Sequence, residues 1–460
     1  MKTASFVTLA ALATIAALPV QADGFDAILP GSLGRIEVLA PKGRIDNAFV
    51  MLSDVAGWGD VERALAKRLS DAGAMVVGVD LPALRAAVAA NPVACQYLVG
   101  EIESIVHQAQ RLAGNSSYRV PVLTGVRDGA ALAKALAGQA PNGAFDKVIA
   151  VDPAATVSLA VPLCAEAPHA GEAVKLMAEF RPTQLRNPLD ILVTQKGSPE
   201  GLAEAHKLQT AGLPVRVSRI QAADAQAVLE QRLQTLVRHQ SARPAALTSS
   251  LPIVELPATG RHNVMAIFYS GDGGWRDIDE QLAGILQKKG VPTVGVDALR
   301  YFWSKKETKL LADDLAKLMD TYTQRWGIDQ VILIGYSFGA GVLPAIYNAL
   351  PDANKMQIAQ ISLLGLEEKA NFEIKVGGWL GAPAGDDAKP TLPEVKLLPA
   401  ERMQCVYGVE ETDTVCPSLK GTPVEVIQLP GGHHYDGDYR KLARLLIDGA
   451  TRRLGQPEIN

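Results

Sequence analysis

Short apolar segments alternate with amphipathic segments along the chain, and the same alternation occurs twice. Each half opens with an apolar, β-rich segment, which begins at Asn47 in the first half and at Asn263 in the second. A loop rich in Gly with one Trp follows in each half, then a segment with helical periodicity, then an apolar segment that ends in Gly-Val-Asp. Strands that alternate with amphipathic helices predict a parallel sheet with helices on both faces.

The second half allows the more detailed prediction. We expect strands near 264–269, 293–297, 330–334, 358–364, 402–407 and 424–429, and helices near 276–289, 309–324, 339–349 and 437–453. Between the halves, residues 239–259 are polar at first and rich in Ala, Ser and Pro, which is the composition of a linker. The pattern predicts an α/β fold of two tandem, doubly wound, α/β-hydrolase-like domains, at 23–238 and 260–460.

The first residues have the order of a secretory signal peptide. Lys2 precedes an apolar run over 4–18, and Val20-Gln21-Ala22 offers a small-x-small cleavage site. We expect residues 1–22 to be removed on export to the periplasm. The alternative is a retained membrane anchor, although the run is short for a bilayer span of about 20 residues.

Composition narrows the class of protein. The chain of 460 residues is 48% hydrophobic, and its formal charge of −4 arises from 45 basic and 49 acidic residues. A packed globular protein is therefore expected, without the basic field that nonspecific nucleic-acid binding needs. We predict no nucleic-acid partner.

Four cysteines remain after the signal peptide. An even number in an exported chain indicates disulfides, and one pair in each half gives Cys95–Cys164 and Cys405–Cys416, one of three possible connectivities. No Cys or His lies at zinc-site spacing from either pair, so we predict no metal site. Nothing in the sequence indicates a redox cofactor.

A nucleophile elbow is predicted in the second half. The apolar segment from Val331 leads directly into Gly335-Tyr336-Ser337-Phe338-Gly339 and then into a helical segment. This is the strand–turn–helix setting of the G-x-S-x-G motif, in which small residues flank an exposed serine. Ser337 is therefore the predicted nucleophile; the alternative is a glycine-rich turn with an inert serine.

The base and the acid are expected after Ser337, in the order Ser, acid, His. Only His433 and His434 follow the serine. We favour His434, because a Gly-x-x-His turn followed by an aromatic residue is usual for this loop, with His433 as the alternative. For the acid we favour Asp413, four residues before a proline, with Glu411, three residues after a glycine, as the alternative. Solvated surface roles are the competing interpretation for these loop residues.

The oxyanion of a tetrahedral intermediate needs two backbone N–H donors. The predicted donors are Phe338, directly after the nucleophile, and the loop over 269–275, which includes Gly271 and Asp272.

The first half lacks this chemistry. Its equivalent of the elbow reads Gly125-Val126-Arg127-Asp128-Gly129, and the stretch 220–225, which matches the histidine loop, has no histidine. We therefore predict a degenerate, non-catalytic N-terminal domain. Arg127 is either an anion contact or a surface residue without a role.

Four motifs in the second half, SGDGGWRDID, VGVDALRYFWSKK, GYSFGAGVLP and LPGGHHYDGDY, resemble the AcvB/VirJ family of bacterial virulence proteins. With its degenerate N-terminal half, the chain resembles the longer, AcvB-like form. The resemblance implies a periplasmic α/β-hydrolase that acts on lysyl-phosphatidylglycerol at the membrane surface, with links to membrane lipid homeostasis, virulence and type IV secretion proteins. It places the nucleophile at Ser337 and the base in the pair His433 and His434.

A carboxylic ester of this kind is a substrate that a Ser–His–acid site cleaves. A carboxylate near the pocket would select the lysyl group, and the candidates are Asp272, Asp297 and Asp436. Trp275, Arg300 and Tyr336 are further candidates for substrate contact. The segment 300–303 either touches lipid or packs beneath the site. The competing functions are a binding or chaperone module with a relic site, and an esterase or thioesterase for small soluble substrates.

Overall fold

The structure is a computed structural model, and it describes residues 24–165, 176–177, 185–241, 251–258, 262–374 and 387–455. The predicted signal peptide, 1–22, and about half of the predicted linker, residues 242–250 and 259, lie outside these ranges. Among the described helices, none has both the length and the apolar character needed to cross a membrane.

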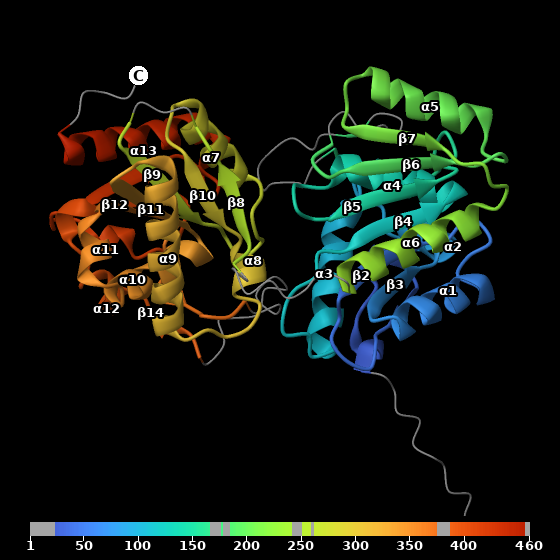
Figure 1. Cartoon of the computed structure of the whole chain (residues 1–460), viewed down its shortest axis with the longest axis horizontal. Coiled ribbons are helices and arrows are strands. Elements are labelled where there is room, and N and C mark those ends of the chain that lie inside the picture. The colour runs from blue at the N-terminus through green and yellow to red at the C-terminus, as the bar shows by residue number, and fades with distance from the viewer. Residues whose placement is uncertain are drawn as a thin grey trace, which may run out of the picture.

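The described chain forms two seven-stranded sheets that lie side by side (Figure 1). The first has the order β1-β3-β2-β4-β5-β6-β7 and contains β1 (Ile36–Leu39), β2 (Asn47–Leu52), β3 (Ala74–Val79), β4 (Val122–Val126), β5 (Lys147–Val151), β6 (Leu189–Val193) and β7 (Val215–Arg219). Its helices are α1 (Asp60–Asp71), α2 (Leu81–Ala90), α3 (Leu98–Leu112), α4 (Arg127–Gln139), α5 (Pro199–Thr210) and α6 (Ala225–Ser241).

The second sheet repeats this order as β8-β10-β9-β11-β12-β15-β16. Its strands are β8 (Ile253–Leu256), β9 (Val264–Tyr269), β10 (Thr293–Val296), β11 (Gln330–Tyr336), β12 (Ile358–Leu364), β15 (Met403–Gly408) and β16 (Glu425–Leu429). The helices are α7 (Ile278–Lys288), α8 (Ala298–Tyr301), α9 (Thr308–Trp326), α10 (Phe338–Asn348), α11 (Asp352–Met356), α12 (Leu392–Val395) and α13 (Tyr439–Leu454). A separate small antiparallel pair consists of β13 (Lys369–Ala370) and β14 (Lys389–Pro390).

The doubly wound α/β fold is confirmed in both halves. Each sheet is parallel except for one edge strand, since β1 pairs antiparallel with β3 and β8 pairs antiparallel with β10. In the second domain α7 and α13 bury their apolar sides against one face of the sheet, and α9 and α10 cover the other. The six predicted strands and four predicted helices of this domain are all present within two residues of their predicted ends.

The segment predicted as a linker includes one edge strand. Residues Ile253–Leu256 form β8, which aligns along β10 and partly buries its apolar side chains. Proline residues on both sides of this short segment resemble linker composition, but a proline flanking an edge strand leaves its ladder intact. The N-terminal counterpart, β1, is equally short.

Both domains pack a tryptophan on a strand glycine. A Cβ atom at Gly78 would lie 2.1 Å from the Trp58 ring, and one at Gly295 would lie 2.2 Å from the Trp275 ring. Both rings are buried. The Gly-Val-Asp motif therefore recurs because its glycine makes room for the tryptophan of the loop after β2 or β9.

The predicted disulfides, Cys95–Cys164 and Cys405–Cys416, are both present. The first joins two loops of the N-terminal domain. The second ties the end region of β15 to the loop that carries the predicted acid.

The contact between Gly295 and Trp275 gives a stability prediction. We expect Gly295→Ala to lower the free energy of unfolding by about 1–3 kcal/mol, because the added methyl group overpacks the site. Gly284→Ala is the matched control, since no atom lies within 4 Å of the added methyl in helix α7. That variant should be neutral or more stable by up to about 1 kcal/mol. Urea unfolding of both variants is the measurement, and equal midpoints would contradict the packing argument.

Candidate active site

The turn from β11 to α10 has the geometry of a nucleophile elbow. Ser337 adopts φ 53° and ψ −115°, a conformation that non-glycine residues rarely take. A Cβ atom at Gly335 would lie 2.6 Å from the Gly339 oxygen, and one at Gly339 would lie 2.2 Å from the Tyr269 oxygen. Both glycines are therefore required for the helix to approach the sheet this closely.

The backbone of Ser337 is fixed at the carboxyl edge of the sheet. Its N–H donates to the Leu364 oxygen at the end of β12, at 2.8 Å. Phe338 is the first residue of α10, so its N–H has no acceptor one turn earlier in the helix. On the other side, a Cβ atom at Gly271 would lie 3.8 Å from the Ser337 Cβ, which brings the loop after β9 beside the serine.

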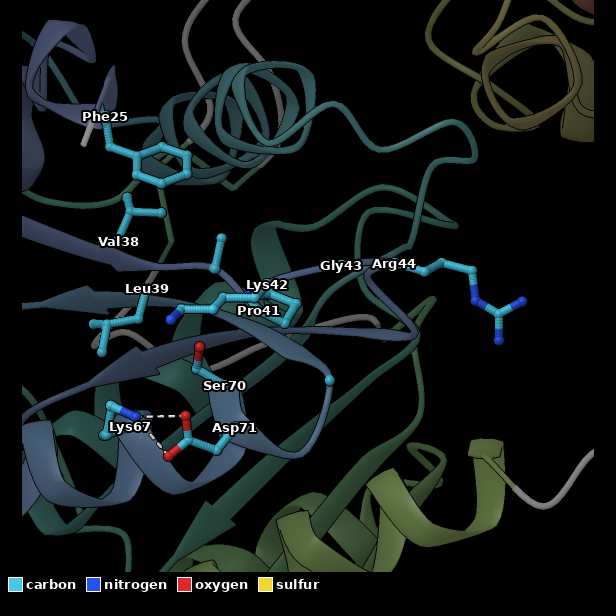
Figure 2. A pocket seen from close by; sticks show the side chains of 12 residues that line it. Phe25, Val38, Leu39, Pro41, Lys42, Gly43, Arg44, Lys67, Ser70 and Asp71 are labelled. Atoms are coloured by element: carbon cyan, nitrogen blue, oxygen red, sulfur yellow. Dashed lines mark hydrogen bonds and ion pairs between the residues drawn. The ribbon is translucent and has the colours of Figure 1, made fainter. Parts of the chain in front are cut away.

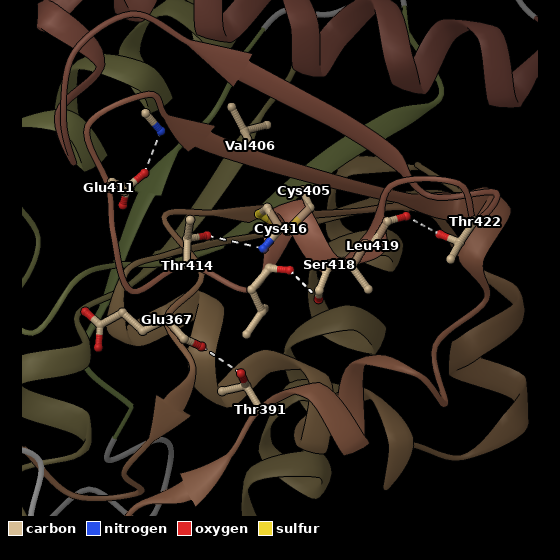
Figure 3. The surroundings of a disulfide bond; sticks show 12 residues. Glu367, Thr391, Cys405, Val406, Glu411, Thr414, Cys416, Ser418, Leu419 and Thr422 are labelled. Carbon is tan, nitrogen blue, oxygen red and sulfur yellow. Dashed lines mark hydrogen bonds between the residues drawn. A yellow bond between two sulfur atoms is a disulfide. The ribbon is translucent and has the colours of Figure 1, made fainter.

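His433 is joined to a buried carboxylate. Its Nδ1 lies 2.5 Å from the Glu411 Oε1, and the Glu411 side chain is only 6% exposed. The other carboxylate oxygen accepts from the Gly408 N–H at 2.5 Å, a contact seen in Figure 3. Glu411 is thus held at both oxygens under the end of β15.

Ser337 and His433 both border the end of β12. Gly365, at φ 60°, directly follows Leu364, the residue that accepts from the Ser337 N–H. A Cβ atom at Gly365 would lie 2.6 Å from the His433 Cε1. The imidazole also lies beside the Tyr336 ring, with 5.1 Å between centroids. Serine, imidazole and carboxylate thus converge on one sheet edge.

The preferred choices of base and acid, His434 and Asp413, differ from the pair that the structure joins. His434 is exposed, and its Nδ1 lies 3.5 Å from the Tyr336 hydroxyl. Tyr435 and Asp436 take positive φ values, and the buried Tyr435 ring anchors the turn. The aromatic residue is therefore the anchor, and the histidine two positions before it turns inward.

Asp413 is exposed, and its backbone oxygen accepts from the Glu368 N–H at 3.0 Å. Glu411 is two residues nearer the strand end, and its longer side chain folds back beneath Gly408. The Cys405–Cys416 disulfide closes this loop (Figure 3). In the adjacent loop after β12, the backbone oxygen of Glu367 accepts a hydrogen bond from the Thr391 hydroxyl at 2.6 Å.

Electrostatics at the imidazole favour its charged form. Burial lowers the pKa of His433, but the hydrogen bond and charge of Glu411 raise it, and Glu367 and Asp413 add to this effect. The resulting pKa lies above the ordinary value for histidine. Burial raises the pKa of Glu367 as well, together with the charges of Asp413 and Asp272.

The loop after β9, residues 270–277, is called the β9 loop below. Beneath it lies Asp279, whose burial raises the pKa of the carboxyl well above its usual value despite hydrogen bonds from the Arg276 and Gly271 N–H groups. The Gly271 N–H thus faces Asp279, and Asp272, the other predicted donor of this loop, is the next residue. Glu367 and Asp279 were not predicted from the sequence, although Glu367 follows a strand end at the same edge.

The remaining residues predicted to contact the substrate differ in burial. Trp275 lies in the core against Gly295, and the Asp297 carboxylate accepts from the Arg300 N–H as the N-cap of α8. Tyr336 is buried, and its hydroxyl donates to the His433 oxygen at 3.3 Å. Arg300 and Asp436 are exposed.

The alternative of lipid contact by the segment 300–303 does not fit its burial. Phe302 and Trp303 are fully buried and Tyr301 is nearly so. Only Arg300 of this segment reaches the surface.

The degenerate elbow keeps its backbone but not its chemistry. Arg127 takes φ 48°, close to the value at Ser337, and its guanidinium pairs with Asp54 at 3.0 Å. Asp54 occupies the place of Gly271 in the aligned loops. The charge of Arg127 is thus already matched within the domain, which disfavours a role in binding an external anion.

Solved structures match the chain at low similarity. An esterase, Est1E from Butyrivibrio proteoclasticus with bound ferulic acid, is 14% identical at a TM-score of 0.31, covering 45% of this chain and 96% of that one. An esterase from Pyrobaculum calidifontis is 15% identical at 0.28, covering 45% and 84%. A bacterial brefeldin A esterase is 16% identical at 0.29, covering 45% and 72%. These scores assign no function, and the fold follows from the strand order and the elbow.

The search of curated proteins gives no match. The family model of the bacterial virulence protein VirJ matches residues 263–454, which include the β9 loop, the elbow and the histidine loop. The C-terminal half of the chain is therefore similar to the VirJ family of bacterial virulence proteins, and it has an α/β-hydrolase fold.

Proposed function

We propose that this protein is a serine ester hydrolase with Ser337 as nucleophile, His433 as base and Glu411 as acid. The observation that carries the proposal is the buried Glu411 carboxylate bonded to His433, whose ring borders the same strand end as Ser337. A serine hydroxyl needs a base, and the base needs an acid that fixes its orientation. The degenerate domain has none of these residues at the aligned positions.

The arrangement supplies the steps of acyl transfer. With Nδ1 engaged by Glu411, the Nε2 atom of His433 is the nitrogen that takes the Ser337 proton as the hydroxyl attacks the ester carbonyl. The N–H groups of Phe338 and Asp272 are the proposed donors to the oxyanion. The imidazolium then protonates the departing alkoxide, and water releases the acyl group by the same route.

The carboxylates around the site favour a cationic substrate. Asp272, Glu367 and Asp413 all act electrostatically on one another or on His433. An anionic acyl group would be repelled, whereas the two ammonium groups of a lysyl ester would be attracted. Together with the family match, this supports lysyl-phosphatidylglycerol as substrate, in the periplasm, with a role in membrane lipid homeostasis and virulence. The two disulfides fit an exported chain.

The first prediction concerns the nucleophile. We expect Ser337→Ala to lower kcat/KM for release of lysine from the lipid by roughly 10³-fold or more, because no covalent intermediate forms. A fluorophosphonate probe should label the unmodified protein and leave the variant unlabelled. Arg127→Ala, at the aligned position of the degenerate elbow, is the control and should be fully active.

Equal labelling of Ser337→Ala and the unmodified protein would contradict this assignment. A folded protein that takes no probe would instead favour a binding module. Hydrolysis of p-nitrophenyl butyrate without any change in lipid extracts would favour an esterase for small soluble substrates.

The second prediction concerns pH. The base must be neutral to accept a proton, so activity is lost as the pH falls through the raised pKa of His433. In the pH profile of kcat/KM, the midpoint of the acid limb should therefore lie above the ordinary histidine pKa of about 6.5. Glu411→Gln should shift this limb to lower pH, because the variant loses the charge that stabilises the imidazolium, and should lower kcat by roughly 10²–10⁴-fold.

Glu410→Gln is the matched control for that experiment, since Glu410 is the exposed neighbour in the same loop. Its profile should match that of the unmodified protein. An acid limb that stays in place in Glu411→Gln would show that another group titrates.

The third prediction concerns selectivity. Asp272→Asn should raise KM for lysyl-phosphatidylglycerol about fivefold relative to alanyl-phosphatidylglycerol, the effect of losing about 1 kcal/mol of charge attraction. Assays of both lipids in the same vesicles provide the measurement. An equal change in KM for both lipids would argue against a contact with the lysyl side chain.

A further inference from the structure

Helix α3 of the degenerate domain presents one stripe of side chains to the catalytic domain. Glu103, His107 and Arg111 are spaced four residues apart, so they lie on one face of the helix. Each contacts a residue of the C-terminal domain. Figure 1 shows α3 on the side of the N-terminal domain that faces α8.

Trp303 anchors this contact. Its ring is fully buried, lies 4.9 Å from the Tyr118 ring between centroids, and has the Arg111 guanidinium 4.0 Å above it. The indole N–H donates to the Asn115 oxygen at 2.9 Å. Arg111 also donates to the Ile374 oxygen at 2.5 Å.

A buried ion pair connects the same helix to the β9 loop. The Arg276 Nη1 donates to the Glu103 Oε1 at 2.6 Å, and the two side chains are 21% and 11% exposed. Removing one member of such a pair leaves the other buried without its charge partner. The pair therefore strongly favours one position of Arg276.

The Arg276 side chain in turn packs against the backbone of the β9 loop. A Cβ atom at Gly273 would be 2.8 Å from the Arg276 Nη2, so the guanidinium packs directly against this part of the loop. The next residue, Asp277, has φ 49° and ψ −112°, a strained conformation that its surroundings must hold. The β9 loop is thus fixed by Asp279 from its own domain and by Glu103 from the other.

The degenerate domain has no matching contact. Gly59 stands in its loop where the catalytic domain has Arg276, and the Gly59 N–H donates to Glu62 of its own helix α1. The bond across the domains therefore belongs to the loop beside Ser337.

We propose that the degenerate domain positions the oxyanion donor of the catalytic domain, with Glu103 of α3 acting through Arg276 on the β9 loop. Glu103 is a positioning residue, because it contacts neither the serine nor the substrate. The inference rests on the proposed ester hydrolysis for the role of the donor and for its kinetic test, whereas the positioning of the β9 loop by Glu103 does not depend on that function. A change of loop position by about 1 Å is enough to impair stabilisation of the transition state.

Glu103→Gln in the full chain tests the proposal. With p-nitrophenyl butyrate as substrate, we expect kcat to fall about tenfold with little change in KM, because the donor acts on the transition state. Hydrogen exchange of the peptide over 270–277 should become faster. Glu37→Gln is the matched control, since Glu37 pairs with Arg63 within the N-terminal domain at 2.9 Å, and both measurements should stay unchanged there.

Unchanged kcat and unchanged exchange in Glu103→Gln would overturn the proposal. If that variant does not fold, Arg276→Lys replaces it, since lysine keeps the charge but loses the second guanidinium nitrogen that reaches Gly273, and the same two outcomes apply. An unmodified protein that hydrolyses no ester contradicts the proposed function, and the exchange measurement then decides the role of α3 by itself.

Another pocket lies in the N-terminal domain, between β1 and the C-terminal end of α1 (Figure 2). Gly73 directly precedes β3 and Arg44 lies shortly before β2, so this pocket is at the amino edge of the sheet, opposite the elbow. Lys67 pairs with Asp71 and Arg44 pairs with Asp46. These cations are already matched, and the pocket supports no proposal.

Discussion

The close contact between α10 and the carboxyl end of β9 constrains the whole catalytic edge. At Gly339 the helix backbone is so near the Tyr269 carbonyl that a single methyl group would overlap it, at 2.2 Å. A helix that begins this close to the sheet forces the preceding residue, Ser337, into a positive φ. Ser337 is thereby placed, partly buried, at the sheet edge, and the loops after β15 and β16 carry the carboxylate and the imidazole at the same edge. The chemistry depends on a steric requirement that is met by glycine alone.

The degenerate domain shows that this steric requirement and the chemistry are separable. A Cβ atom at Gly129 would lie 2.4 Å from the Leu52 oxygen, and Arg127 keeps the positive φ of the elbow. The nucleophile has nevertheless been replaced by an arginine that pairs with Asp54. The fold keeps its tight turn because sheet and helix cannot pack otherwise, whereas the side chain at the turn is free to change.

The sequence predicted the regular elements well because both domains are built from strongly periodic segments between turn glycines. It was less informative where position depends on the path of a loop. The structure joins His433 to Glu411, whereas motif spacing favoured His434 and Asp413, because the buried Tyr435 ring and the reach of a glutamate to the Gly408 N–H do not appear in motif spacing. Trp275 resembles a substrate contact in sequence but fills the space above Gly295. The pairing across domains, Glu103 with Arg276, joins residues 173 positions apart and has no local signal.

The two domains share an extensive contact, so they are better described as one structural unit than as two independent modules. Trp303 follows α8 of the catalytic domain, yet its ring lies among Tyr118, His107 and Arg111 of the other domain. A catalytic domain alone would expose this indole to water and leave Arg276 without its carboxylate, at a cost in both apolar burial and charge pairing. The first half can therefore lack a nucleophile and still support the β9 loop. Its α3 needs only the folded N-terminal sheet to hold it in place against that loop.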